Sequence, residues 1–243
     1  GGIGTMGPGE TKLEVDRRRI SDRIAKLKKD LKEVSLSRQV KRKKRQNDQI
    51  PLISLVGYTN AGKSSLMRAM TGSDVLVADK LFATLDTTIR PLYPETRPKV
   101  LMSDTVGFID KLPHGLVASF RSTLQEVLEA DILLHVVDCS SPHYFKQMEV
   151  TRDVLEEIGA GEKPTFLVFN KADLLKEVLL PKILQRKYID CVIVSALSEA
   201  DMTKLRDAIF SYFERDMMEV ELVVPYHNTW LQSQIHEFSK VLH

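Results

Sequence analysis

The sequence is poor in cysteine and in aromatic residues, and it has no long apolar run. No apolar stretch approaches the roughly 18 residues of a membrane-spanning helix, and the longest are interrupted by charged residues. The two cysteines, Cys139 and Cys191, lie in apolar strand-like segments without metal-ligand spacing or a CxxC arrangement. This context predicts buried, reduced thiols in a soluble cytoplasmic protein with no membrane partner. Because the chain starts at Gly1, without an initiator methionine or a signal peptide, we expect it to begin inside a longer natural protein.

The length of 243 residues leaves room for one ordinary domain and a smaller one, and 43% hydrophobic residues suffice for a core. Positive charge is concentrated near the start. Residues 10–49 contain 15 Lys or Arg against 7 Asp or Glu, or +8, which leaves 20 against 26, or −6, for residues 50–243. We expect a glycine-rich loop and basic helical segment at 1–49, a main domain at 50–215 and a strand-helix extension at 216–243.

The first segment predicts a loop followed by a helix. Residues 1–9 include five glycines and a proline, which favour a flexible loop. From Thr11 onward, apolar residues recur with heptad spacing, at Leu13, Ile20, Ile24, Leu27, Leu31 and Val34. Arg17 interrupts this stripe. About three heptads suffice for a helical hairpin or a docked helix, and not for a long coiled coil.

The other faces of this helix are basic, and the segment ends in the run KRKKR at residues 41–45. Such charge is typical of a solvated face or linker, or of contacts with the phosphate backbone of a nucleic acid, and charge patterning leaves both open. No aromatic residues are interleaved, so stacking on single strands is not indicated. A large structured RNA is the better fit.

The octapeptide GYTNAGKS at residues 57–64 joins a strand-like run at 52–56 to a helical pattern at 65–70. This is the context of a phosphate-binding loop, in which glycines let the backbone wrap around a phosphate; an ordinary glycine-rich turn is the alternative. Lys63 would reach the β- and γ-phosphates, and the Ser64 hydroxyl would bind Mg²⁺. The expected nucleotide contacts here are Gly57, Tyr58, Thr59, Asn60, Ala61, Gly62, Lys63, Ser64 and Ser65.

Two further segments predict contacts with Mg²⁺ and the γ-phosphate. In residues 80–90, KLFATLDTTIR, a loop threonine can give the metal a second hydroxyl; we choose Thr88, with Thr87 the near alternative. The strand-like run at 100–103 leads into DTVG, where Asp104 can hold Mg²⁺ through water and the Gly107 N–H can approach the γ-phosphate. The expected catalytic residues are Lys63, Thr88 and Gly107, and the expected metal ligands are Ser64, Thr88 and Asp104.

Guanine specificity is predicted by two short motifs. Asn170-Lys171-Ala172-Asp173 follows a strand-like run at 165–169, and Ser195-Ala196-Leu197 follows another at 191–194. The Asp173 carboxylate can accept from both the ring N–H and the exocyclic amine of guanine, a pattern that adenine lacks. Asn170 would brace the loop, and the Lys171 stem would cover the base. A backbone N–H of residues 195–197 would reach guanine O6.

The strand-like runs alternate with helical stretches. Residues 146–158 are helical in pattern and lie between runs at 132–137 and 165–169, which predicts parallel strands with crossover helices. A helix at 201–214 closes the domain, with a buried stripe of Met202, Leu205, Ile209 and Phe213. The expected fold class is α/β.

The motifs GYTNAGKS, TLDTTIR, DTVG, NKAD and SAL, in this order, resemble those of P-loop GTPases over residues 50–215. LFATLDTT, DTVGFIDKLPH and the upstream GGIGTMGPGETKLEVDRRRI narrow the resemblance to the HflX family, over nearly the whole chain. It implies a P-loop GTPase domain with a mostly parallel six-stranded sheet flanked by helices, preceded by the basic coiled-coil-like segment. It also implies a GTPase that binds the large ribosomal subunit and, in some members, splits stalled or idle ribosomes. The basic segment would contact rRNA, and we expect a monomer.

Two departures from the family bear on activity. The family has a further N-terminal domain before the glycine-rich segment, which this sequence does not include, so the chain would keep nucleotide chemistry and lose part of the ribosome activity. Thr87 stands where many members carry proline, which leaves Thr88 as the metal-binding threonine and makes the loop less rigid.

The tail at 220–226 and a helix at 229–242 resemble the start of a small C-terminal domain, or form a strand and helix packed on the main domain. Trp230 is expected in the core.

Phe108 occupies the position where Ras-like GTPases carry a glutamine that orients the attacking water, and a phenyl ring cannot do this. We therefore expect slow intrinsic GTP hydrolysis, stimulated by a partner that the resemblance suggests is the large ribosomal subunit. Asn60 either braces the loop or, as in related GTPases, helps to hold a K⁺ ion in place of an arginine finger.

Two other functions stay open. One is an ATP-using P-loop protein. The motif NKAD at residues 170–173 argues against it, because it predicts guanine and not adenine. The other is a nucleotide-dependent RNA-binding or scaffolding module with little hydrolysis of its own, which Phe108 supports.

Overall fold

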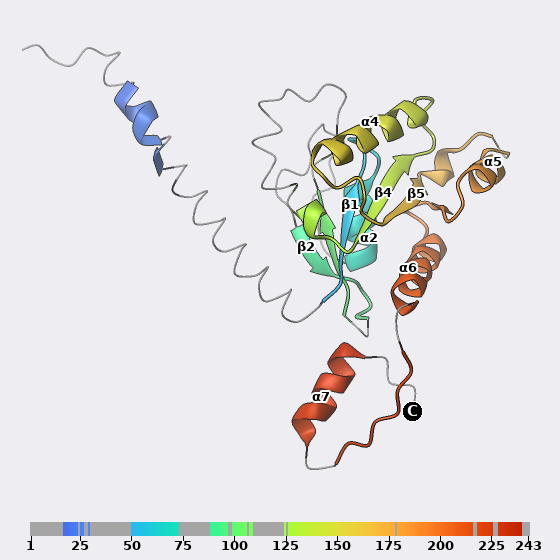
Figure 1. The fold of residues 1–243 in the computed structure, drawn as a ribbon. Coiled ribbons are helices and arrows are strands. Elements are labelled where there is room, and N and C mark those ends of the chain that lie inside the picture. Colours follow the sequence, from blue (N-terminus) through green and yellow to red (C-terminus); the bar gives the residue numbers. More distant parts are fainter. Residues whose placement is uncertain are drawn as a thin grey trace, which may run out of the picture. The chain divides into compact units, whose positions relative to one another are not determined.

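A computed structural model of the chain describes residues 17–23, 25–26, 29, 50–72, 88–96, 99–105, 107–108, 124, 126–177, 179–215, 218–225 and 228–239. The chain divides into two compact units, Gly1–Gln49 and Ile50–His243. Each unit is described by itself (Figure 1).

In the first unit, residues 17–23 form a helix whose side chains are all exposed, Ile20 included. Residues 25, 26 and 29 are helical too, so the predicted helix is confirmed over this stretch. The loop at 1–9, five of the six apolar heptad positions and the basic run at 41–45 lie outside the described residues.

The second unit is built on a six-stranded sheet with the order β2-β3-β1-β4-β5-β6. The strands are β1 (Leu52–Val56), β2 (Thr88–Pro91), β3 (Leu101–Asp104), β4 (Ile132–Asp138), β5 (Thr165–Asn170) and β6 (Val192–Ile193). β2 runs antiparallel to β3, and all other neighbouring strands of this sheet are parallel. The predicted mostly parallel six-stranded sheet is therefore confirmed.

Helices lie between these strands in the sequence and after the last of them. They are α2 (Lys63–Thr71), α4 (Tyr144–Glu157), the 3₁₀ helix η1 (Ala172–Leu174), α5 (Leu180–Lys187), α6 (Glu199–Glu214) and α7 (Thr229–Phe238). The helices predicted at 65–70, 146–158 and 201–214 are confirmed as α2, α4 and α6. None of the helices in the described part of the chain is long and apolar enough to cross a membrane.

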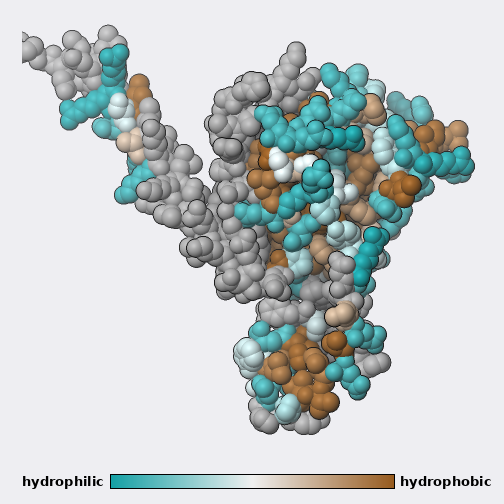
Figure 2. All heavy atoms as spheres, viewed as in Figure 1, coloured by the Kyte–Doolittle hydropathy of each residue, from teal (hydrophilic) through white to brown (hydrophobic). Residues whose placement is uncertain are grey.

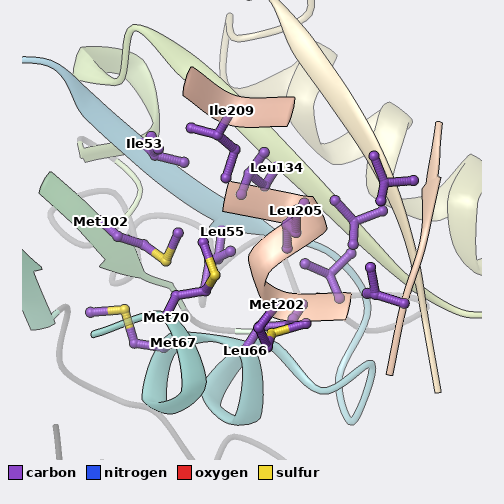
Figure 3. Packing of buried hydrophobic residues seen from close by; sticks show 14 of the residues in the cluster. Ile53, Leu55, Leu66, Met67, Met70, Met102, Leu134, Met202, Leu205 and Ile209 are labelled. Carbon is purple, nitrogen blue, oxygen red and sulfur yellow. The ribbon is translucent and has the colours of Figure 1, made fainter. Parts of the chain in front are cut away.

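The central strands are apolar on both faces, as expected for parallel strands with helices on each side. Ile53 and Leu55 of β1 pack with side chains of α2 and α6, and Figure 3 shows these side chains pointing toward one another. Leu52 of the same strand belongs to a second cluster, which contains Leu155 of α4. The predicted stripe of α6 is confirmed. Its residues Met202, Leu205 and Ile209 are buried, and Phe213 packs against the same cluster.

The C-terminal extension differs from the prediction. Residues 218–225 form no strand, and Leu222 and Val223 are exposed. The strand predicted at 220–226 is therefore wrong over its described residues, because a strand exists only where its backbone pairs with a neighbour. The helix that follows is confirmed as α7, whose first turn is capped by Asn228: its Oδ1 accepts from Leu231 N at 3.3 Å.

Trp230 lies on α7 and is 70% exposed, so its assignment to the core is wrong. Figure 2 shows hydrophobic atoms gathered on the visible surface of the α7 region. Both cysteines are free thiols; the predicted burial is confirmed for Cys139, whereas Cys191 is only half-buried. Burial raises the pKa of the Cys139 thiol to about 11.

Candidate nucleotide-binding site

The phosphate loop, residues 57–64, connects β1 to α2. Its backbone has positive φ at Gly57 (146°), Asn60 (60°) and Gly62 (93°). A Cβ atom on Gly57 would lie 2.2 Å from Val136 O, and one on Gly62 would lie 2.2 Å from Asn170 Nδ2. Glycine is therefore required at both of these positions, for backbone conformation and for space.

Lys63 begins α2, and its ammonium group lies inside the phosphate loop. Its Nζ donates to Gly57 O and to Tyr58 O, both at 3.0 Å. Burial lowers the pKa of Lys63 to about 8, although the Asp104 carboxylate acts in the opposite direction. A phosphate in the loop would stabilise the charged ammonium, so this group is suited to bind an anion. Ser65 follows in the first turn of α2.

Ser64, Asp104 and Thr88 come together from α2, β3 and β2. Ser64 Oγ donates to Asp104 Oδ2 at 2.8 Å, and Asp104 is buried. Thr88 is the register partner of Asp104 in the antiparallel pair β2–β3. One carboxylate and two hydroxyls are oxygen donors that Mg²⁺ accepts together with phosphate and water. This set of residues therefore fits the ion, and Thr87 lies outside the described residues.

The DxxG segment lies against the phosphate loop. Phe108 N donates to Gly57 O at 3.1 Å, and Thr59 N donates to Phe108 O at 2.8 Å. A Cβ atom on Gly107 would lie 2.7 Å from Thr59 Cα and 3.0 Å from Lys63 Nζ. Such a close approach of two backbones requires glycine at position 107.

The Phe108 side chain is part of the hydrophobic core. It is 3% exposed and belongs to the cluster that contains Leu52, Val56 and Leu133. Its burial explains why a phenyl ring occupies this position. The side chain offers no polar atom that could orient a water molecule.

Asn170, the last residue of β5, links the phosphate loop to the loop at 195–197. Its Nδ2 donates to Ala61 O at 3.0 Å, and its Oδ1 accepts from Ala196 N at 3.1 Å. The side chain is 1% exposed. These contacts bring together residues that are 109 and 26 positions from Asn170 in the sequence.

Lys171 follows with a left-handed backbone, at φ 64°. Its Nζ pairs with Asp138 Oδ2 at 2.8 Å. Asp138 Oδ1 in turn accepts from Ser140 N at 3.0 Å and from the Ser140 hydroxyl at 2.5 Å. The Lys171 side chain is therefore held at the end of β4.

Asp173 is exposed, and its Oδ1 accepts from Ser195 Oγ at 2.6 Å. The three amides of residues 195–197 all donate within the protein. Ser195 N donates to Asp201 Oδ2, Ala196 N to Asn170 Oδ1, and Leu197 N to Ser195 Oγ. Guanine O6 would therefore share one of these N–H groups with its present acceptor.

Two carboxylates beside this site were not predicted from the sequence. Asp138 ends an apolar strand at the edge where the other motifs lie, and this position is the signal that could have identified it. Asp201 lies in the first turn of α6, where an acidic residue is common for reasons of helix capping alone. Its contact with Ser195 is therefore visible only in the structure.

The chain is similar to known GTPases along most of its length. Residues 1–45 match the family described as GTP-binding GTPase Middle Region, and residues 52–171 match the family described as 50S ribosome-binding GTPase. GTPase HflX of Gluconacetobacter diazotrophicus is 55% identical over 236 residues, which cover 97% of this chain and 52% of that protein. GTPase HflX of Escherichia coli is 40% identical over 243 residues, which cover 99% of this chain and 57% of that protein.

A solved structure of a GTP-binding protein from Sulfolobus solfataricus, in complex with GDP, is 27% identical, with a TM-score of 0.55. The match covers 84% of this chain and 63% of that one. The chain spans about half the length of the curated relatives that it matches. With these relatives, which match it over nearly its whole length, the chain belongs to the HflX family of GTPases.

Proposed function

We propose that this chain binds GTP with Mg²⁺, hydrolyses it to GDP and phosphate, and acts as a switch on the large ribosomal subunit, with a role in splitting stalled or idle ribosomes. The observation that carries the proposal is the pair of hydrogen bonds of Asn170. Through them, one buried side-chain amide joins the phosphate loop to residues 195–197, which we call the base-reading loop. A single nucleotide would then contact both.

The residues of the chain have distinct tasks in this proposal. The amides of the phosphate loop and Lys63 Nζ bind the β- and γ-phosphates, and the Gly107 N–H, close to Lys63, donates to the γ-phosphate. Ser64, Thr88 and Asp104 would hold Mg²⁺, which would offset negative charge on the phosphate oxygens. Asp173 reads the guanine edge, and Lys171 covers the base.

Intrinsic hydrolysis is slow in this proposal because Phe108 cannot orient water. A partner that reshapes the site would supply the missing means of orienting the attacking water. Single-turnover measurement of GTP hydrolysis by the isolated chain tests this point, and a fast rate would contradict it.

The proposed ribosome contact is supported by the family match of residues 52–171 and by the exposed basic helix. Arg17, Arg18, Arg19 and Arg23 are all exposed. Contacts of such residues with rRNA phosphates would weaken strongly with salt. We place the protein in the cytoplasm, as a monomer; its free cysteines agree with a reducing compartment.

Base recognition is tested by substituting Asp173. The wild type should bind GTP far more tightly than ATP. Asp173→Asn should lose affinity for GTP and gain affinity for xanthosine triphosphate, because the amide can donate to the additional oxygen of xanthine. Asp207→Asn, an exposed position on α6, is the matched control and should leave the preference unchanged. Equal affinity of the wild type for GTP and ATP would contradict the proposal.

Asn60 is proposed to help hold a K⁺ ion beside the phosphates. Its backbone has a positive φ and its side chain is exposed, which leaves the amide oxygen open to a ligand. Hydrolysis should be faster in K⁺ than in Na⁺, and Asn60→Ala should remove the difference. The same rate in both salts would show that Asn60 only braces the loop.

The second candidate function is a nucleotide-dependent RNA-binding or scaffolding module with little hydrolysis, which the buried Phe108 favours. Cosedimentation with large ribosomal subunits distinguishes the two. Binding that differs between GDP and a non-hydrolysable GTP analogue, together with ribosome-stimulated hydrolysis, supports the GTPase switch. Nucleotide-dependent binding without stimulated hydrolysis supports the scaffolding module.

A further inference from the structure

The loop that carries Ser195, Ala196 and Leu197 has little support from the sheet. β6 contains only two residues, Val192 and Ile193. Val194 N still donates to Phe169 O at 2.8 Å, whereas the backbone N–H groups of residues 195–197 donate to side chains. The position of this loop therefore depends on those side chains.

Asp201 is one of these side chains. Its Oδ2 accepts from Ser195 N at 2.9 Å. Its own backbone N–H donates at 3.2 Å to Ser198 Oγ, the N-cap of α6. The carboxylate is thus attached to a capped helix end. A charged acceptor makes a stronger hydrogen bond to an amide than a neutral one.

The contact of Asp201 is transmitted to the residue that reads the base. Ser195, held by its N–H, donates its hydroxyl to Asp173 Oδ1 at 2.6 Å and accepts from Leu197 N at 3.2 Å. Asp173 is exposed, so its carboxylate would turn freely without this support. Two consecutive hydrogen bonds therefore connect Asp201 to Asp173.

We propose that Asp201 is a positioning residue for guanine recognition: it fixes Ser195 and, through Ser195, the carboxylate orientation of Asp173. The inference rests on the proposed guanine site and adds a residue that does not touch the nucleotide. Its loss should weaken the contact with the exocyclic amine of guanine more than the contacts with the phosphates.

A simpler role for Asp201 is to stabilise α6 as an acidic residue in its first turn. Glu199 distinguishes this role from the positioning of Ser195, because it lies in the same turn and carries the same charge. Glu199 is exposed, and its backbone oxygen accepts a hydrogen bond from Thr203 Oγ1. Glu199→Ala is therefore the matched control for Asp201→Ala.

The experiment measures dissociation constants of GDP, IDP and ADP for the whole chain, together with thermal unfolding. IDP keeps the ring N–H but lacks the exocyclic amine, so the ratio of the IDP and GDP constants reports the contact of Asp173 with that amine. For Asp201→Ala, the GDP constant should rise about tenfold, the loss expected for one charge-assisted hydrogen bond. The IDP constant should rise less than threefold, so the ratio falls. Asp201→Asn should be intermediate, because its amide oxygen still accepts from Ser195 N.

The Glu199 control and the two Asp201 variants distinguish the positioning role from the structural one. Glu199→Ala should leave the ratio at the wild-type value, even if it lowers the unfolding temperature as much as Asp201→Ala does. An unchanged ratio in both Asp201 variants would overturn the inference while leaving the proposed function intact. If Asp201→Ala does not fold, Asp201→Asn decides by the same ratio. A wild type that does not prefer GDP to ADP would overturn the proposed function, and the inference with it.

Discussion

His135 is a buried titratable residue on β4, 7% exposed. Its Nε2 makes no hydrogen bond within the described part of the chain. Burial, with smaller contributions from the positive charges of Arg152 and Lys63, lowers the pKa of His135 from 6.5 to about 4. The folded protein therefore keeps this imidazole neutral at pH values where the unfolded chain protonates it.

The lowered pKa of His135 makes the stability of the folded protein depend on pH. Because the folded pKa lies below the unfolded one, the unfolded state takes up the proton first as the pH falls. The free energy of unfolding should decrease between about pH 6.5 and pH 4, by about 2 kcal/mol from this residue between pH 7.5 and pH 5. Urea unfolding at both pH values measures this decrease.

The variant His135→Leu should lose less stability than the wild type over the same pH change. His143→Leu, at an exposed position, is the control and should follow the wild type. Equal decreases for the wild type and His135→Leu would show that His135 does not carry the effect.

Helix α6 connects the hydrophobic core to the base-reading loop. Leu205 is 0% exposed and belongs to the cluster that contains residues of α2 and the sheet (Figure 3). In the first turn of the same helix, Asp201 accepts from Ser195 N. Arg206 Nη2 also donates to Tyr93 O at 2.6 Å, after β2. The helix thus contacts the core, the loop at 195–197 and the segment that follows β2.

Truncating the buried side of α6 should destabilise the second unit. Leu205→Ala should lower the free energy of unfolding by about 2–5 kcal/mol, because it leaves a cavity in a packed core. Leu222→Ala removes the same atoms at an exposed position and should cost less than about 0.5 kcal/mol. Urea unfolding followed by circular dichroism compares the two, and equal losses would contradict this account of the core.

At the scale of the whole molecule, charge is divided between the two units. The exposed helix at 17–23 is basic, whereas residues 50–243 carry a net charge of −6. Simultaneous reversal of Arg17, Arg18 and Arg19 to Glu should weaken cosedimentation with the large ribosomal subunit. It should also flatten the salt dependence, because fewer counterions are released on binding.

The control reverses an equal charge in the second unit, at Lys182, Arg186 and Lys187, all exposed on α5. We expect this variant to bind ribosomes as the wild type does, and both variants to bind GDP with unchanged affinity. Equal loss of ribosome binding in both would show that the effect reflects total charge and not the basic helix.

The sequence by itself determined most of the elements and predicted the type of site. Short apolar runs bounded by glycine and polar residues specify buried strands, and the order of the motifs predicts phosphate, metal and base contacts at successive strand ends. Phe108 was predicted not to orient water, because the chemistry of a phenyl ring is independent of the fold. These inferences depend on local spacing and residue type, which a single sequence contains.

The tertiary structure decided how distant residues meet. The bonds of Asn170 to two loops, the pairing of Asp138 with Lys171 and the contact of Asp201 with Ser195 all depend on the order of strands in the sheet. The burial of Trp230 and the strand at 220–226 were mispredicted for the same reason. Apolar residues and alternating patterns become core or strand only when another segment lies beside them, and local sequence does not specify that neighbour.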